Sequence, residues 1–199
     1  MIKNIIFDIG NVLIYFAWKE AMVDLGFSDE CIGTLDKGFI NDPLWDELDL
    51  GILPESAVID KAVLRFPEYE KEIRKFWNNN ILTIRPFAYS EPWIQSLKER
   101  GFKVYLLTNY PDSLFEKSVK FAFPFYPYVD GEIVSSRVKI RKPDEGIYRA
   151  LFDKYNLLPK ESVFFDDRPI NIEGAKNVGL NAFLFKSMEQ AERDLASVI

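Results

Sequence analysis

Polar residues placed just past short apolar runs constrain the fold of this chain more than any other feature. They come in four segments, at Asp8 to Asn11, Thr108 and Asn109, Arg141 to Pro143, and Asp166 and Asp167. Short apolar runs of this kind are typical of buried parallel strands, and ligands bind at the carboxyl ends of such strands in an open α/β sheet. We therefore predict an α/β protein whose functional groups converge at one edge of its sheet.

The helical pattern of residues 17–85 differs from that of the remaining chain. It is broken by glycines and prolines and contains no clear alternating strand, whereas helix and strand alternate from Pro86 onward. Helices are expected at 90–100, 111–121, 144–155 and 188–199, and strands at 102–107, 131–135, 162–165 and 181–185. We predict a Rossmann-like parallel sheet with helices on both faces, formed by residues 1–16 and 86–199. A small helical domain, residues 17–85, is inserted after the first strand on two linkers near Tyr15 and Arg85.

Composition excludes several classes of protein. The net charge of −6 argues against a partner such as duplex DNA or an anionic membrane. With no histidine, catalysis by Ser-His or Cys-His pairs is excluded, and Cys31, the single cysteine, cannot form an intrachain disulfide. Cys31 is expected to be a buried apolar residue. No apolar run reaches the roughly 18 residues of a membrane span, so we expect a cytoplasmic protein. We expect it to be a monomer or a homodimer.

Carboxylates supply the candidate chemistry. Asp8 follows a buried strand, where its carboxylate can attack phosphorus or can merely cap a turn. Asp166 and Asp167 are adjacent, and two neighbouring carboxylates are costly to hold together without a cation. Hard oxygen ligands of this kind select Mg²⁺. The alternative for this pair is an acidic turn with Arg168 as its counterion.

Hydroxyl, amide and amine groups complete the set. Thr108 and Asn109 can donate hydrogen bonds to phosphate oxygens, or can form an ordinary helix cap. Lys142 can neutralise both Asp8 and a bound phosphate, or can be a solvated surface group. Together the four segments favour a carboxylate nucleophile that works beside a divalent metal ion.

The motifs also carry a resemblance to a known family. The segments are FDIGNVLI, LLTNYPDSLF, IRKPDEGIY and VFFDDRPINIEGAKNVG. Over essentially the whole chain they resemble the haloacid dehalogenase superfamily of phosphohydrolases, and especially its branch similar to bacterial α-glucose-1-phosphate phosphatases. The resemblance implies that Asp8 forms an aspartyl-phosphate. It implies that Mg²⁺ is bound by Asp8, the Gly10 carbonyl, Asp166 and Asp167, that Thr108, Asn109 and Lys142 hold the phosphoryl group, and that Asn171 supports the site.

One position departs from the family pattern. Most phosphatases of the superfamily carry a second aspartate two residues after the nucleophile, as general acid and base, and this chain has Gly10 there. Such a group contributes about 10² to 10⁴ in rate. Asn11, a substrate hydroxyl or a good leaving group, such as an anomeric sugar phosphate, can compensate. Dehalogenases also lack the second aspartate and need no metal, but Asp166 and Asp167 would repel an anionic haloacid.

The sequence therefore predicts a Mg²⁺-dependent phosphatase of a small phosphorylated metabolite, with sugar phosphates first. The helical insert should select the substrate, and Tyr15, Phe16 and Trp18 beside the first linker are the candidate substrate contacts. The other aromatic residues of the insert are expected to belong to its core. A protein of the same fold that binds a phosphorylated ligand without turnover is the alternative from a different class.

Overall fold

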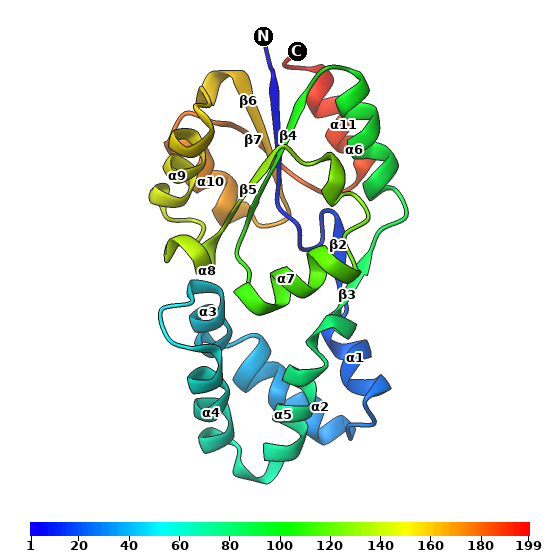
Figure 1. Ribbon diagram of the computed structural model, residues 1–199, viewed down its shortest axis with the longest axis vertical. Coiled ribbons are helices and arrows are strands. Elements are labelled where there is room, and N and C mark those ends of the chain that lie inside the picture. The colour runs from blue at the N-terminus through cyan, green and yellow to red at the C-terminus, as the bar shows by residue number, and fades with distance from the viewer.

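Two lobes, joined by a narrow ribbon, make up the computed structural model, which describes residues 1–199 (Figure 1). The larger lobe contains a five-stranded sheet in which all neighbouring strands are parallel. In spatial order the strands are β5 (Gly131–Val134), β4 (Lys103–Thr108), β1 (Asn4–Phe7), β6 (Ser162–Asp166) and β7 (Asn181–Leu184). The chain's first strand is thus the central one, with β4 and β6 on either side.

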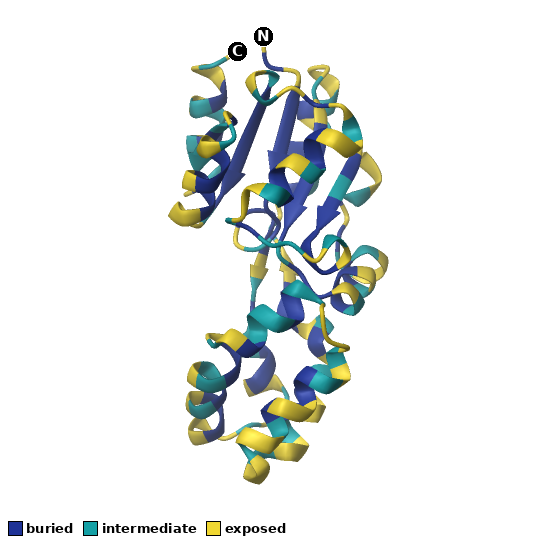
Figure 2. Ribbon diagram, turned by 90° about the vertical axis from the view of Figure 1, so that its left-hand side faces the viewer, coloured by how far each residue is buried: buried dark blue, intermediate teal, exposed yellow.

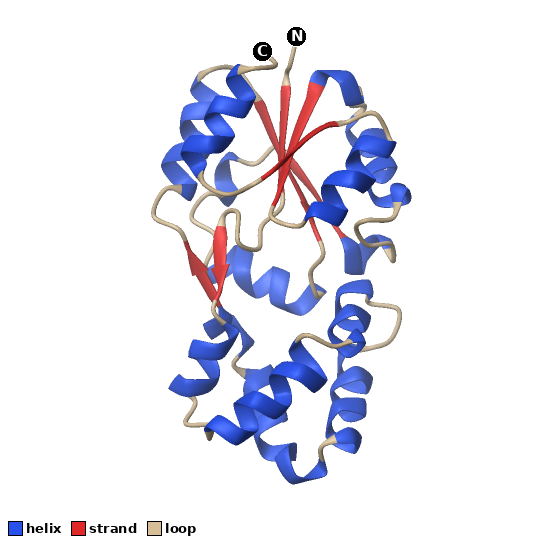
Figure 3. Ribbon diagram, turned by 180° about the vertical axis from the view of Figure 1, so that it is seen from behind, coloured by secondary structure: helices blue, strands red, loops and turns tan.

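Helices cover both faces of this sheet (Figure 3). Ile5 and Phe7 of β1 belong to one buried cluster, together with residues of α6 (Ser90–Glu99), α7 (Asp112–Phe121) and α11 (Met188–Ala196). Ile6 points to the opposite cluster, which includes residues of α9 (Glu145–Tyr155) and α10 (Pro169–Asn177). Strands buried on both faces must be apolar throughout, which explains the continuous apolar runs of the sequence (Figure 2).

The smaller lobe is a bundle of short helices with a core of its own. Its helices are α1 (Trp18–Asp24), α2 (Asp29–Leu35), α3 (Pro43–Leu50), α4 (Glu55–Arg65) and α5 (Glu70–Asn78), with a short π-helical segment at Asp36–Ile40. Phe39 and Phe76 are fully buried in this second core. Cys31 is buried there too, which confirms the expectation for the single cysteine, and burial raises the pKa of its thiol to about 11.

The ribbon between the lobes is a two-stranded antiparallel sheet of β2 (Ile14–Phe16) and β3 (Ile84–Pro86). Tyr15 pairs with Arg85 at its middle. The sequence predicts plain linkers near these two residues, because strands of three residues are too short to show an alternating pattern. Both connections to the helical lobe therefore run side by side (Figure 1).

Other elements lie close to their predicted positions, with two differences. Asp144 precedes α9 and caps it, since its carboxylate accepts a hydrogen bond from the Gly146 amide at 2.7 Å. The expectation that every polar segment directly follows a strand is wrong for Arg141 and Lys142: β5 ends at Val134, and the short helix α8 (Ser135–Val138) intervenes. None of the helices is both long and apolar enough to cross a membrane.

Candidate active site

Two carboxylates meet at the carboxyl ends of the central strands. Asp8 directly follows β1, and Asp166 is the last residue of β6. The two strands pair in register through Phe7 and Phe165, and the Asp8 amide donates to the Phe165 carbonyl at 2.9 Å. The sheet therefore brings together two residues that are far apart in the sequence. The Asp8 carboxylate caps no turn, because its one polar partner is an amine from another loop.

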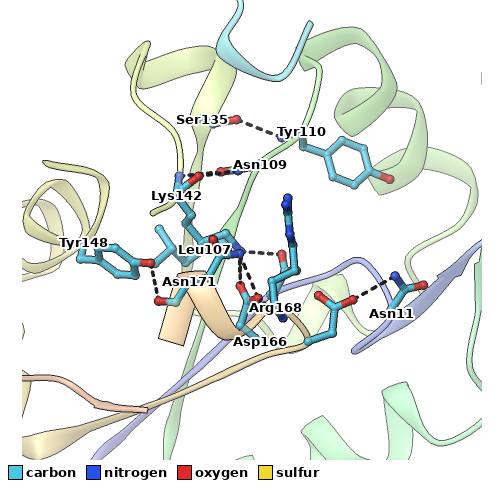
Figure 4. A network of polar contacts seen from close by, with 12 residues as sticks. Asn11, Leu107, Asn109, Tyr110, Ser135, Lys142, Tyr148, Asp166, Arg168 and Asn171 are labelled. Atoms are coloured by element: carbon cyan, nitrogen blue, oxygen red, sulfur yellow. Dashed lines mark hydrogen bonds and ion pairs between the residues drawn. The ribbon is translucent and has the colours of Figure 1, made fainter. Parts of the chain in front are cut away.

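Lys142 supplies that amine and lies buried between the two carboxylates (Figure 4). Its Nζ is 2.8 Å from an Asp8 oxygen and 2.6 Å from an Asp166 oxygen, and it donates to the Leu107 carbonyl at 2.8 Å. Burial lowers the pKa of Lys142, but Asp166 and Asp8 raise it more, so the net pKa lies above its ordinary value. Lys142 is thus a fixed ammonium ion and not a solvated surface group.

Asn109 holds the main chain of Lys142 in place. Its side-chain amide donates to the Lys142 carbonyl at 3.0 Å and accepts from the Lys142 amide at 2.8 Å. The Asn109 side chain is therefore bonded to Lys142, and the predicted contact between Asn109 and phosphate stays a prediction for its main-chain amide. Thr108, the last residue of β4, is buried and pairs with Val134. It does not cap α7, whose N-cap is Pro111.

Three carboxylates form an acidic cluster. Oxygens of Asp8, Asp166 and Asp167 all lie within 4.8 Å of one another. Burial raises the pKa of Asp8, Lys142 opposes this, and Asp166 and Asp167 raise it further, to about 7. Burial is also the main cause that raises the pKa of Asp167. One ammonium ion facing three carboxylates leaves excess negative charge, which a divalent cation would neutralise, and an all-oxygen donor set fits Mg²⁺.

Neighbouring polar groups orient the cluster. The Asn171 amide donates to both oxygens of Asp166 at 2.9 and 3.0 Å, and the Arg168 main-chain amide donates to the same carboxylate at 2.8 Å. Asn11 donates to Asp167 at 3.1 Å (Figure 4). The guanidinium of Arg168 forms no ion pair with either carboxylate, although its charge lowers the pKa of Asp167. The direct countercharge of Asp166 is Lys142.

A cavity of about 730 Å³ lies between the acidic cluster and the helical lobe. The core lobe lines it with Asp8, Gly10, Asn11, Asn109, Tyr110, Lys142, Asp167, Arg168 and Asn171, among others. Tyr15, Phe16 and Trp18, the predicted substrate contacts, all line it as well. Trp45 of α3 joins them, with its ring 5.4 Å from that of Phe16. Thr108 and Asp166 do not reach the cavity wall. The cavity is thus lined by aromatic side chains from β2 and the helical lobe and by polar side chains from the core lobe.

Contacts between the lobes close this cavity on one side. Arg141 holds Asp46 of α3 through two hydrogen bonds of 2.6 and 2.7 Å. The Ser135 hydroxyl donates to the main-chain carbonyl of Asp49 at 2.5 Å, and Lys139 donates to the Gly51 carbonyl. The end of α3 is therefore fixed against the core lobe.

Sequence reasoning missed Asp46 and Asp49, which line the cavity from α3. The sequence indicates no function for Arg141, although it lies in the segment IRKPDEGIY. No sequence signal marks these residues, because an acidic side chain on a short helix normally faces solvent. Asp49 is nevertheless buried, and its side-chain carboxyl accepts no hydrogen bond from the protein. Burial raises the pKa of Asp49 to about 8, with Asp46 as the next cause.

The chain belongs to the haloacid dehalogenase-like hydrolase family, whose model matches residues 2–179. A sesquiterpene phosphatase from Aspergillus oryzae is 27% identical over 89% of this chain and 87% of its own length. A phosphatase from Mycobacterium tuberculosis is 25% identical over 99% of this chain and 95% of its own length. A solved HAD family enzyme from Bacteroides thetaiotaomicron, in complex with magnesium and inorganic phosphate, has a TM-score of 0.76 at 25% identity, covering 94% of this chain and 96% of that chain.

Proposed function

We propose that this hydrolase is a Mg²⁺-dependent phosphatase that acts on a small phosphomonoester, with sugar phosphates as the first candidates, through an aspartyl-phosphate intermediate. One observation carries the proposal: Lys142 lies between Asp8 and Asp166 at the edge of a cavity large enough for a small metabolite. The phosphatases among the relatives and the structural neighbour that binds magnesium and phosphate support it.

Asp8 is the nucleophile in this mechanism. Its oxygen attacks phosphorus, the bond from phosphorus to the leaving oxygen breaks, and water later attacks the aspartyl-phosphate to release phosphate. Lys142 stays charged throughout and stabilises the negative charge of the transferring phosphoryl group. The two hydrogen bonds from the Asn109 side chain keep Lys142 at this position. Thr108, the residue before Asn109, is the last residue of β4.

Mg²⁺ would be held by Asp8, the Gly10 carbonyl, Asp166 and Asp167. It would supply positive charge to the phosphoryl oxygens and would lower the pKa of Asp8, whose nucleophilic form is the carboxylate. Asn171 and Asn11 orient two of these carboxylates through the hydrogen bonds described above. Partners that fix a metal ligand are commonly worth about 10- to 100-fold in metal affinity or activity.

The helical lobe acts as a cap that selects the substrate. Its closed position is held by the pairing of Arg141 with Asp46, and it lays Phe16, Trp18 and Trp45 along the cavity. Aromatic faces stack on the apolar faces of sugar rings and on other apolar groups. A phosphorylated metabolite would therefore place its phosphate at Lys142 and its carbon skeleton against this wall, with water excluded during phosphoryl transfer.

Two other activities fit the site less well. A haloacid carries a carboxylate, and the three clustered carboxylates would repel it unless a cation intervened, whereas dehalogenation needs no metal. A ligand-binding protein without turnover needs no buried carboxylate placed against an amine at the cavity edge. The set of Asp8, Lys142 and the acidic pair favours hydrolysis over both.

Phosphate release from a panel of phosphomonoesters tests the proposal. The panel contains hexose phosphates, a prenyl phosphate and an aryl phosphate, each with Mg²⁺ or with chelator. We expect metal-dependent release by the native chain and its loss in Asp8→Asn, while Asp60→Asn, a change at an exposed carboxylate of the helical lobe, serves as the control. Failure of the native chain to release phosphate from any ester, although Mg²⁺ binds, would leave a binding role instead.

A further inference from the structure

Outside the acidic cluster assigned to Mg²⁺, the core lobe contains no free proton donor for the leaving group. Gly10 has no side chain, and the space beside it is open, because an added Cβ would meet no atom within 4 Å. Lys142 has three donor protons, and Asp8, Asp166 and the Leu107 carbonyl already accept all of them. Asn11 cannot release a proton and is bonded to Asp167. A proton donor supplied by the protein would therefore have to lie elsewhere in the cavity.

Most other titratable groups in the cavity wall already have partners. Asp46 is paired with Arg141, and Asp42 caps α3 and pairs with Arg65. The Tyr15 hydroxyl donates to Glu20 at 2.7 Å. The Tyr110 hydroxyl is bonded to Ser118, and burial raises its pKa well above the ordinary value. Each of these groups is therefore already engaged by another side chain.

Asp49 is the exception. Asp49 lines the cavity and is buried, and its Oδ1 has no hydrogen-bond partner. An unpartnered buried carboxyl is costly and requires an explanation in a native structure. Asp49 lies about one helical turn after Asp46. The Arg141 guanidinium donates both of its hydrogen bonds to Asp46 and forms no ion pair with Asp49. The protonated form of Asp49 is therefore favoured, which makes this residue a candidate proton donor in the cavity wall.

The main chain at Asp49 is fixed with respect to the core. Its carbonyl accepts from the Ser135 hydroxyl at 2.5 Å, and the same hydroxyl oxygen accepts from the Tyr110 amide at 3.0 Å. Tyr110 follows β4 and Asn109, so these two bonds connect α3 to the segment that orients Lys142. A proton donor on the helical lobe is thereby held in register with the phosphate site when the lobes are closed.

We infer that Asp49 is the catalytic acid and base that the core lobe lacks, an assignment that rests on the proposed phosphatase function. In the first step Asp8 bonds to phosphorus, and the Asp49 carboxyl gives its proton to the leaving oxygen, which departs as an alcohol. In the second step the Asp49 carboxylate takes a proton from water as the water oxygen bonds to phosphorus. Asp8 is released as a carboxylate, phosphate leaves, and Asp49 is again protonated.

Charged and titratable groups around Asp49 set the pH range of this role. Asp46 on its own helix and Asp8 on the core raise its pKa, while Arg141 and Lys142 lower it, and Tyr110 lies close by as a neutral phenol. Burial dominates, and the pKa of about 8 keeps the carboxyl protonated at neutral pH. We expect kcat/KM for an alkyl phosphate to fall above about pH 8, and this limb to disappear in Asp49→Asn.

Leaving-group dependence tests the assignment. An aryl phosphate with a nitrophenolate leaving group needs no protonation, whereas a hexose phosphate ester of a primary alcohol does. In Asp49→Asn we expect the first step with the hexose phosphate to slow by about 10² to 10⁴. The burst of nitrophenolate should keep its native rate, followed by slow release of phosphate. An equal slowing of both first steps would indicate a structural role, and unchanged kinetics would exclude Asp49 altogether.

Two further variants complete the experiment. Gly10→Asp in the Asp49→Asn background places a carboxyl in the open space beside the nucleophile, and we expect it to recover at least about tenfold of the lost rate with the hexose phosphate. Asp60→Asn controls for the loss of a charge from the helical lobe. Turnover by the native chain that Asp49→Asn leaves intact would overturn the role of Asp49 alone. No turnover by the native chain would overturn the phosphatase function itself.

Discussion

Asn109 and Lys142 are joined by two hydrogen bonds that run in opposite directions. The Asn109 side-chain Nδ2 donates to the Lys142 main-chain carbonyl, and the Lys142 main-chain amide donates to the Asn109 side-chain Oδ1. An asparagine side chain that pairs with a peptide group in this way fixes the main chain of a segment that belongs to no strand. Lys142 needs such support, because β5 ends eight residues earlier, at Val134. The amine's position thus depends on a side chain from a different strand end.

Asn109→Ala should lower kcat/KM by about 10²-fold, since a small displacement of a positioned group has an effect of this size. Asn109→Asp keeps the acceptor for the Lys142 amide but loses the donor, and it should have an intermediate effect. Steady-state phosphate release measures both variants. Equal activity in Asn109→Ala and the native chain would show that the pair has no part in placing Lys142.

Lys142→Met should destabilise the folded chain by about 3–5 kcal/mol, because Asp8 and Asp166 would be left without a countercharge in a buried site. Urea unfolding measures this loss. Added Mg²⁺ should restore part of the stability, since a cation at the acidic cluster replaces the missing charge. Lys3→Met, which removes an exposed ion pair with Glu161, should cost about 1 kcal/mol or less. Similar losses in both variants would contradict the prediction.

Asp49 should make the stability of the chain fall as the pH rises. Its pKa is about 8 in the folded chain and about 4 in an unfolded one, so the folded chain binds the extra proton between these values. Stability therefore decreases as the pH rises through that window. Asp49→Asn lacks this proton, and its stability relative to the native chain should increase by up to about 4 kcal/mol between pH 5 and pH 9, at about 1.4 kcal/mol per pH unit between the two pKa values. Urea unfolding of the native chain and of Asp49→Asn at both pH values measures this change. The same stability difference between the two proteins at pH 5 and pH 9 would refute the prediction.

Gly51→Ala should push the lobes apart. Gly51 has a φ of 62°, and an added Cβ would meet the Ser136 side chain and carbonyl of the core lobe at 2.8 Å. Gly26→Ala is a matched control, because Gly26 has a φ of 80° and open space around it. Both variants should lose about 1–2 kcal/mol from backbone strain. Only Gly51→Ala should raise KM and enlarge the radius of gyration in solution scattering. Unchanged scattering in Gly51→Ala would contradict the proposed contact.

The sheet and its reactive edge could be predicted because they depend on local pattern. A continuous apolar run that ends in Asp8 or Asp166 indicates a buried parallel strand, and parallel strands bring their carboxyl ends to one edge. The sequence also offered Lys142 as the countercharge of Asp8, and the two form an ion pair. The start of α9 was predicted to within one residue, because Asp144 caps this helix and does not begin it.

Contacts between distant segments could not be predicted in this way. The pairing of Arg141 with Asp46 joins residues 95 positions apart, and its partners look like ordinary surface charges in the sequence. Asp49 is buried because the core lobe lies over α3, which no local pattern encodes. The hydrogen bonds between the Asn109 side chain and Lys142 could not be predicted for the same reason, because only the fold brings that peptide group to Asn109.

The helical lobe leaves and re-enters the core through β2 and β3, which lie side by side. A segment whose two ends are neighbours can be lengthened, shortened or exchanged without shifting any strand of the five-stranded sheet. A lobe grafted between residues 16 and 84 would find Asp8 and Lys142 already in place. It would have to bring its own counterpart of Asp49. In this architecture, an exchange of the helical lobe would therefore change the substrate contacts and the proposed proton donor together.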